Sequence, residues 1–287
     1  MNPWVKNTLI VFLVFAAGTF LKPPISILVI MYLLQRLTGG AERTKDEIGG
    51  EPANGPNYVS FGFSMAQGRR PYMEDVVFAS TNFLSDGKTC FFGVFDGHAG
   101  KRAALWARDN LPKNLHQEIE NCRAVEEALT RAFLRTDGEF LDKAAREGLS
   151  DGCTVTTAFL SGIELYVANA GDSRTIICRG TNAVPMSLDH KPDRPSERRR
   201  IIQAGGHVTV IGCARVNGVL ATSRGFGDRE LKRYVSAEPE IQHRTLEKGD
   251  DFLVLASDGL WDVMTNSDVA VLLARESRDM RAEAIRV

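Results

Sequence analysis

Short apolar runs alternate with amphipathic stretches along most of the chain, from about residue 61 onward. The runs are rich in Val, Ile, Phe or Leu, and many stop at Ser, Asp or Asn, which is typical of buried β-strands. The sequence predicts strands at residues 76–79, 90–95, 155–160, 164–168, 175–178 and 252–256. A Ser-Gly pair at 161–162 predicts a hairpin turn between two of them, and residues 171–174 predict the next turn.

Amphipathic segments between these strands predict helices. Their positions are residues 101–120, 123–146, 195–204 and 267–275. Pro195 suits the first turn of a helix, because the backbone N–H that proline lacks has no partner there. Strands joined by hairpins, with the helices grouped elsewhere, favour an α+β fold over a doubly wound parallel sheet.

The N-terminal segment has a different pattern. Residues 7–34 are almost wholly apolar, interrupted only by Lys22, Pro23 and Pro24. A membrane span needs about 20 apolar residues, so neither half is long enough alone. We therefore predict that residues 1–37 form a membrane anchor, as one kinked single-pass helix or as a re-entrant hairpin. A cleaved signal peptide and an organelle-targeting segment are the alternatives.

The residues after this segment are slightly more basic than those before it, which favours a cytosolic location for the rest of the chain. Residues 38–58 contain Gly, Glu and Pro and predict a flexible linker. Residues 59–287 are numerous enough to bury a sizeable core, in one large domain or two small ones.

Composition narrows the function classes. The chain of 287 residues has a net charge of −1, so its overall charge gives no sign of nucleic-acid binding. Its five cysteines are scattered and form no Cys-x-x-Cys pair, which argues against a zinc site and against a disulfide framework. Reduced thiols in a cytosolic domain are the simplest interpretation.

Carboxylates recur near the ends of predicted strands, often beside a glycine. They are Glu74, Asp75, Asp96, Asp172, Asp228, Asp258 and Asp262. A single Asp-Gly pair is most often only a turn, but several in one domain indicate a shared site. Oxygen ligands without a His or Cys cluster favour Mg²⁺ or Mn²⁺. After Asp96 come Gly97, whose backbone can approach an ion closely, and His98, which titrates near neutral pH.

Seven motifs occur in a fixed order. They are Arg70-x-x-Met73-Glu74-Asp75, Phe92-Gly93-Val94-Phe95-Asp96-Gly97-His98-Ala99-Gly100, Gly152-Cys153-Thr154, Gly171-Asp172-Ser173-Arg174, Asp189-His190-Lys191-Pro192, Ser223-Arg224-Gly225-Phe226-Gly227-Asp228 and Ser257-Asp258-Gly259-Leu260-Trp261-Asp262. This set resembles the metal-dependent type 2C Ser/Thr protein phosphatases, the PPM family, over about residues 61–273. The motifs, together with the apolar N-terminal segment, are similar to those of plant or other eukaryotic members with a membrane-anchored N-terminus.

The resemblance implies a central β-sandwich of two antiparallel sheets flanked by α-helices, with two Mg²⁺ or Mn²⁺ ions in a cleft at one end. It implies that Asp96 bridges both ions, that Gly97 gives its carbonyl to one, and that Asp258 binds the other. Glu74 would act through metal-bound water. The positions linked to a weaker third ion are matched by Asp172 and Asp262.

The implied reaction is hydrolysis of phosphoserine and phosphothreonine in proteins by a hydroxide that bridges the two ions. Asp96 would take part through both ions, Arg70 would bind the phosphate with its planar fork, and His98 would protonate the leaving alkoxide. Thr154 matches a polar residue near the metal waters. The expected partners are phosphorylated proteins and kinases, with no nucleic acid, and the chain is expected to be a monomer.

The end of the chain departs from the family pattern. Members usually continue with another helix and a final strand, whose Asp-Asn pair supplies a ligand to the second ion. Residues 275–287 are charged and contain no such pair, so we expect the last helix and strand to be missing, with weaker metal binding or poorer folding. The alternative function is a catalytically weak, membrane-tethered pseudophosphatase that binds phosphoproteins as a scaffold. An unrelated Ca²⁺-binding protein is a third hypothesis, and the loop it needs is absent.

Two further regions carry interpretations. Residues 208–218 resemble the family's mobile flap beside the cleft, with an ordinary glycine-rich loop as the alternative. The basic run at 198–200 is interpreted as a solvated helix face, and His190 and His207 as structural residues.

Overall fold

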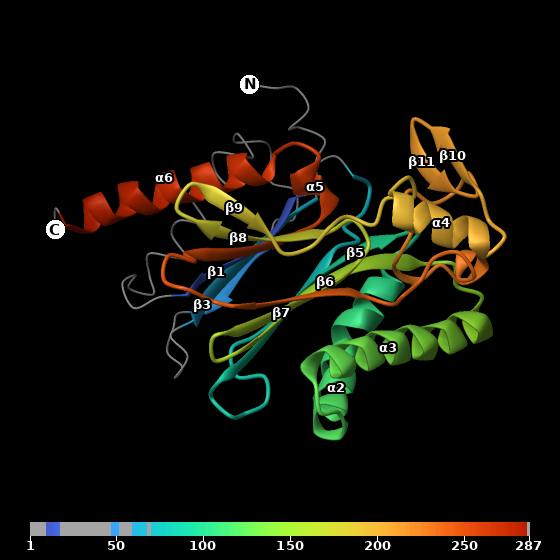
Figure 1. The fold of residues 1–287 in the computed structure, drawn as a ribbon, viewed down its shortest axis with the longest axis horizontal. Coiled ribbons are helices and arrows are strands. Elements are labelled where there is room, and N and C mark those ends of the chain that lie inside the picture. Colours follow the sequence, from blue (N-terminus) through green and yellow to red (C-terminus); the bar gives the residue numbers. More distant parts are fainter. Residues whose placement is uncertain (1–9, 18–46, 52–58, 68–69, 286–287) are drawn as a thin grey trace.

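Two antiparallel β-sheets pack face to face at the centre of the protein (Figure 1). The computed structural model describes residues 10–17, 47–51, 59–67 and 70–285. The first six-stranded sheet has the order β2 (Glu47–Glu51), β3 (Val59–Ala66), β1 (Ile10–Ala17), β14 (Phe252–Ala256), β8 (Arg174–Arg179), β9 (Asn182–Pro185). The second has the order β13 (Glu240–Thr245), β7 (Glu164–Ala170), β6 (Gly152–Ser161), β5 (Thr89–His98), β4 (Val76–Ser80), and β12 (Phe226–Gly227) also pairs with β6.

Strand β5 shows how the sequence builds this architecture. Successive side chains of a strand point to opposite faces of its sheet. Phe92 and Val94 lie in the core between the two sheets, whereas Phe91 and Phe95 lie in the core beneath the helices. All four are buried, so β5 is covered on both faces and reads as one continuous apolar run.

Helices cover the outer face of each sheet. Helices α2 (Arg102–Asn121) and α3 (Val125–Glu147) cover the second sheet, and α5 (Asp258–Trp261) and α6 (Asn266–Ile285) cover the first (Figure 1). At one end of the sandwich lie α4 (Pro195–Gln203), the hairpin of β10 (Val208–Ile211) and β11 (Cys213–Val216), and the short turn η2 (Arg229–Leu231). The predicted α+β sandwich with external helices is therefore confirmed.

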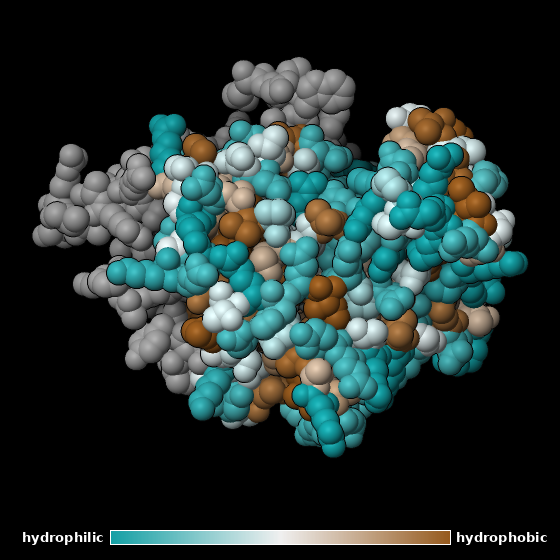
Figure 2. All heavy atoms as spheres, viewed as in Figure 1, coloured by the Kyte–Doolittle hydropathy of each residue, from teal (hydrophilic) through white to brown (hydrophobic). Residues whose placement is uncertain are grey.

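The β10–β11 hairpin, which resembles the family's flap in sequence, exposes apolar side chains. Figure 2 shows a largely polar face with apolar side chains gathered on this hairpin. Val210 is 77% exposed and Ile211 62% exposed.

The predicted strands and helices lie where the structure has them, although α6 continues beyond the predicted 267–275, and one of the two predicted turns differs. The predicted hairpin turn at 161–162 joins β6 to β7, as expected. Residues 171–174 form no hairpin, because β7 belongs to the second sheet and β8 to the first. This segment instead carries the chain from one sheet to the other.

The N-terminal segment departs most from prediction. For the eight residues of β1, the structure shows a strand in place of the predicted membrane helix. Strand β1 pairs with β3 on one side and with β14 on the other, for example Leu13 with Phe63 and with Leu255. A short apolar run suits a buried central strand as well as a helix, and periodicity alone does not separate the two.

The predicted linker at 38–58 is also wrong in part, because β2 pairs with β3. The rest of the predicted anchor and linker lies outside the described residues. Within the described ranges, no helix has both the length and the apolar character that a membrane crossing needs.

Candidate functional site

Five carboxylates gather where the two sheets meet at one end of the sandwich. They are Asp75, Asp96, Asp172, Asp258 and Asp262, and we call them the acidic cluster. Asp75 precedes β4, Asp96 lies near the end of β5, Asp172 lies on the crossing from β7 to β8, and Asp258 and Asp262 flank the short α5 that follows β14. The fold thus brings together acids that are far apart in sequence.

Asp96 lies at the centre of the acidic cluster. Loss of water around its carboxyl raises the pKa of Asp96 well above its usual value, and the charges of Asp75, Asp258 and Asp172 raise it further. Burial likewise raises the pKa of Asp258 to about 6, with help from Asp172 and Asp262. Like charges this close destabilise one another unless protons or cations neutralise them.

Asp75 is a member that the predicted ligand set did not include. It is only 1% exposed, and burial raises its pKa to about 7. Within the described part of the chain, neither carboxyl oxygen of Asp75 makes a hydrogen bond of good geometry, although Asp96 and Ser257 lie near enough to lower its pKa. A buried polar group without a good hydrogen bond is costly. The Glu74-Asp75 pair was visible in the sequence, but the burial that distinguishes Asp75 from Glu74 was not.

The donor set of the acidic cluster suits Mg²⁺ or Mn²⁺, because both ions prefer carboxylate oxygens. The poorly hydrogen-bonded Asp75 oxygens and the mutual repulsion at Asp96 both favour a bound cation. Among the described residues, however, no three acidic, His or Cys side chains are already arranged as a metal site. The acidic cluster therefore suits Mg²⁺ or Mn²⁺ in its ligand type and its negative charge.

At Gly97 the backbone passes very close to Glu74, the residue that precedes Asp75 of the acidic cluster. A Cβ atom at this position would lie 2.6 Å from the carbonyl oxygen of Glu74, so only glycine allows the approach. Glu74 in turn accepts a hydrogen bond of 2.9 Å from the backbone N–H of Gly100. These contacts hold the Glu74 carboxylate beside the loop that follows β5.

His98 is paired with Asp228, an acid of the predicted shared site to which the sequence assigns no role. Its Nε2 lies 2.8 Å from Asp228 Oδ1. Burial lowers the pKa of His98, but the hydrogen bond and charge of Asp228, with Asp172 and Glu74, outweigh burial and raise it. The pairing joins positions 130 residues apart, so no local sequence signal reveals it.

Gly152 makes room for this pair. A Cβ atom there would lie 2.3 Å from both His98 Nε2 and Asp228 Oδ2. Asp228 adopts a left-handed backbone conformation with φ of 48°, which is uncommon for a residue with a side chain.

The other predicted site residues surround the acidic cluster. Arg70 is exposed and forms no ion pair with a described residue, and its charge lowers the pKa values of Asp75 and Asp258. Thr154 pairs with Asp96 across β5 and β6, but it is buried and its hydroxyl lies 2.7 Å from that of Ser173.

The family follows from a comparison with known proteins. The family model described as "Protein phosphatase 2C" matches residues 59–286. The chain belongs to the protein phosphatase 2C family. It is 46% identical over 216 residues to "Probable protein phosphatase 2C 55" of Oryza sativa subsp. japonica, which covers 75% of this chain and 57% of the relative. It is 45% identical over 225 residues to "Probable protein phosphatase 2C 59" of Arabidopsis thaliana, and this match covers 78% of this chain and 72% of the relative.

The chain thus spans less than two thirds of the rice relative's length.

Solved structures support the phosphatase 2C fold. A serine-threonine phosphatase 2C from Toxoplasma gondii superposes with a TM-score of 0.65 at 22% identity, covering 83% of this chain and 90% of the other. A C. elegans sex determining protein superposes with a TM-score of 0.66 at 24% identity, and the match covers 90% of this chain and 66% of the other. The resemblance inferred from the motifs is confirmed.

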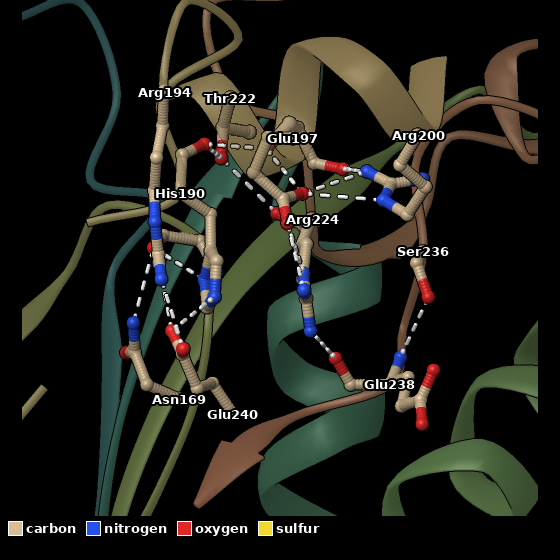
Figure 3. Close-up of polar contacts among 12 residues, drawn as sticks. Asn169, His190, Arg194, Glu197, Arg200, Thr222, Arg224, Ser236, Glu238 and Glu240 are labelled. Carbon is tan, nitrogen blue, oxygen red and sulfur yellow. Dashed lines mark hydrogen bonds and ion pairs between the residues drawn. The ribbon is translucent and has the colours of Figure 1, made fainter. Parts of the chain in front are cut away.

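A buried polar network lies behind the acidic end of this phosphatase 2C domain (Figure 3). Glu197 of α4 is 1% exposed and accepts hydrogen bonds from Arg200, Arg224 and Ser223. Burial raises the pKa of Glu197, but the hydrogen bonds and charges of Arg224 and Arg200 outweigh it and lower the pKa to about 2. The network fixes α4 to the segment that leads into β12.

His190 extends this network toward the acidic cluster. It is fully buried, and its Nδ1 lies 3.1 Å from the backbone nitrogen of Gly171 while its Nε2 lies 3.1 Å from Glu240 (Figure 3). Burial lowers the pKa of His190 to about 4. The interpretation of His190 as a structural residue agrees with these contacts.

Proposed function

We propose that this chain is a metal-dependent phosphatase that hydrolyses phosphoserine and phosphothreonine in proteins. The observation that carries the proposal is the acidic cluster around Asp96 lying beside the His98–Asp228 pair. The cluster suits a pair of divalent cations, and the imidazole suits a proton donor. Membership of the phosphatase 2C family supports the same reaction, and the relatives' names give no support to the pseudophosphatase alternative.

Mg²⁺ or Mn²⁺ ions are the proposed cofactors, two per chain, with a weaker third. The residues proposed to hold them are Asp96, Gly97 through its carbonyl, Asp258, Glu74 through water, and for the third ion Asp172 and Asp262. When bound, such ions supply positive charge opposite the phosphate and lower the pKa of water at the site.

The chain's own residues supply binding and proton transfer. The exposed guanidinium of Arg70 presents two N–H groups that match two phosphate oxygens. Because Asp228 holds Nε2 of His98, Nδ1 is the ring nitrogen free to donate a proton to the leaving serine or threonine oxygen. The raised pKa of His98 favours the protonated form that this step needs.

Hydrolysis of a phosphoserine peptide in Mn²⁺, and again after chelation by EDTA, tests this function. The Asp96→Asn variant removes the central charge of the cluster and is expected to abolish turnover. The matched control is Asp109→Asn, an exposed acid whose ion pair among the described residues is with its neighbour Arg108. Turnover that survives both EDTA and Asp96→Asn would refute the assignment.

Attachment to a membrane through residues 1–37, with the domain facing the cytosol, stays a proposal. The anchor and strand β1 exclude each other, because residues 10–17 cannot cross a bilayer while they pair with β3 and β14. Flotation of the full chain with liposomes distinguishes the two states: co-flotation supports the anchor, and recovery in the dense fraction supports the strand. Phosphoprotein substrates, kinase partners and a monomeric state are likewise proposals.

A further inference from the structure

Lys191 places a positive charge inside the acidic cluster. Its ammonium group donates a hydrogen bond to the carboxylate of Asp172, with Nζ 2.5 Å from Oδ2. Asp172 is 6% exposed, whereas the lysine side chain is 40% exposed. The charge of Lys191 also acts on Asp258, whose pKa it lowers. The lysine therefore neutralises acids that belong to the proposed metal site.

The position of Lys191 is fixed by the two residues before it. Asp189 accepts two hydrogen bonds from the guanidinium of Arg174, at 2.8 and 2.7 Å. The backbone nitrogen of His190 donates to the carbonyl of Gly171 at 2.9 Å, and the His190 ring contacts the same residue. Asp189, His190 and Lys191 thus each contact the segment 171–174. The ammonium group of Lys191 binds Asp172, the acid in that segment.

We propose that Lys191 is a tethered cation that competes with a divalent ion for Asp172. The inference rests on the proposed function only in taking the cluster as a divalent-cation site, which the buried and poorly hydrogen-bonded Asp75 carboxylate independently supports. An ion that binds at Asp172 must first displace the ammonium, and the flexible lysine stem and its exposure allow that displacement. Lys191 thereby weakens binding at Asp172 relative to binding at Asp96.

Removing the competing charge should strengthen the weakest ion site. Lys191→Gln keeps a polar side chain without the charge, and we expect it to tighten the weakest Mn²⁺ association by about twofold to fivefold, the range expected for loss of a partly exposed ion pair. Lys191→Arg retains a cation and should bind Mn²⁺ like the wild type. The matched control is Lys113→Gln, an exposed lysine on α2.

Mn²⁺ binding to the full chain is measured by the electron paramagnetic resonance signal of the free ion, without any assay of turnover. The double variant Lys191→Gln/Asp172→Asn should lose the gain, because the ligand is gone. Circular dichroism melting confirms that each variant folds. Equal or weaker Mn²⁺ binding by a folded Lys191→Gln, or no Mn²⁺ binding by any variant, would overturn the proposal. Tighter binding in a chain that hydrolyses no phosphopeptide would uphold it and refute the proposed function instead.

Discussion

At the scale of single residues, the site depends on contacts that join distant positions. The motifs identify Asp96, Arg70 and His98, because each has a recognisable sequence around it. They do not reveal that Asp75 is buried with poorly hydrogen-bonded carboxyl oxygens, or that Asp228 holds His98. Burial and pairing depend on the folded neighbours, and these are fixed only when both sheets are in place.

The His98–Asp228 pair predicts a dependence on the leaving group. A serine oxygen needs a proton to leave, whereas a nitrophenolate leaves without one. Asp228→Asn should therefore lower kcat for a phosphoserine peptide by about tenfold to a hundredfold and change kcat for p-nitrophenyl phosphate much less. Steady-state kinetics with both substrates provide the check. Equal losses on both would show that Asp228 does not act through proton donation.

Two glycines give opposite predictions for replacement by alanine. At Gly152 a methyl group would meet His98 and Asp228 at 2.3 Å, so Gly152→Ala should disrupt the pair and reduce turnover at least tenfold. At Gly138, inside α3, nothing lies within 4 Å, so Gly138→Ala should leave turnover unchanged and stabilise the fold by about 0.5–1 kcal/mol. Turnover and urea unfolding of both variants are the measurements. An unchanged turnover in Gly152→Ala would contradict the assignment.

At the scale of elements, the sequence predicts most of the strands and helices because their apolar runs are long or regular. It mistakes β1, because eight apolar residues suit a buried strand and part of a membrane helix equally well. It also mistakes the connection at 171–174, since the choice between a hairpin and a crossing depends on which sheet takes β8. Both errors concern long-range pairing.

The buried polar network that fixes α4 predicts a pH-dependent stability. An unfolded histidine takes up a proton near pH 6.5, whereas folded His190 does so only near pH 4. The unfolded state therefore binds more protons than the folded state between these pH values. The part of the free energy of unfolding that comes from neutral His190 is lost as pH falls from 6.5 toward 4. This loss amounts to about 3 kcal/mol relative to His190→Gln, which has no proton to take up.

Urea unfolding of both proteins across this pH range provides the check. The stability advantage of wild type over His190→Gln should shrink as pH falls. An advantage that stays constant from pH 7 to pH 4 would mean that His190 does not remain neutral in the fold.

At the scale of the whole molecule, the first sheet depends on β1. In the order β2-β3-β1-β14-β8-β9, β1 lies between β3 and β14 and is hydrogen-bonded to both. Strand β3 pairs with all eight residues of β1, and β14 pairs with four of them. The strand that leads into Asp258 thus lies directly beside the N-terminal segment, which links the acidic cluster to the beginning of the chain.

Deletion of residues 1–17 should therefore lower the thermal midpoint and weaken Mn²⁺ binding, whereas deletion of residues 1–9 should change both little. The reason is that only the longer deletion removes β1 and exposes the edges of β3 and β14. Differential scanning fluorimetry with and without Mn²⁺ compares the three proteins. A thermal midpoint that is unchanged by the longer deletion would show that β1 does not hold the sheet together.

The central claim is that the acidic cluster around Asp96 binds the cations on which phosphoester hydrolysis depends. The most direct measurement records Mn²⁺ binding and phosphoserine-peptide turnover on the same sample, for the wild type and for Asp96→Asn. We predict that turnover rises with Mn²⁺ occupancy in the wild type, and that the variant loses both together while remaining folded. Turnover that is independent of occupancy, or a variant that keeps its activity without binding Mn²⁺, would contradict the account.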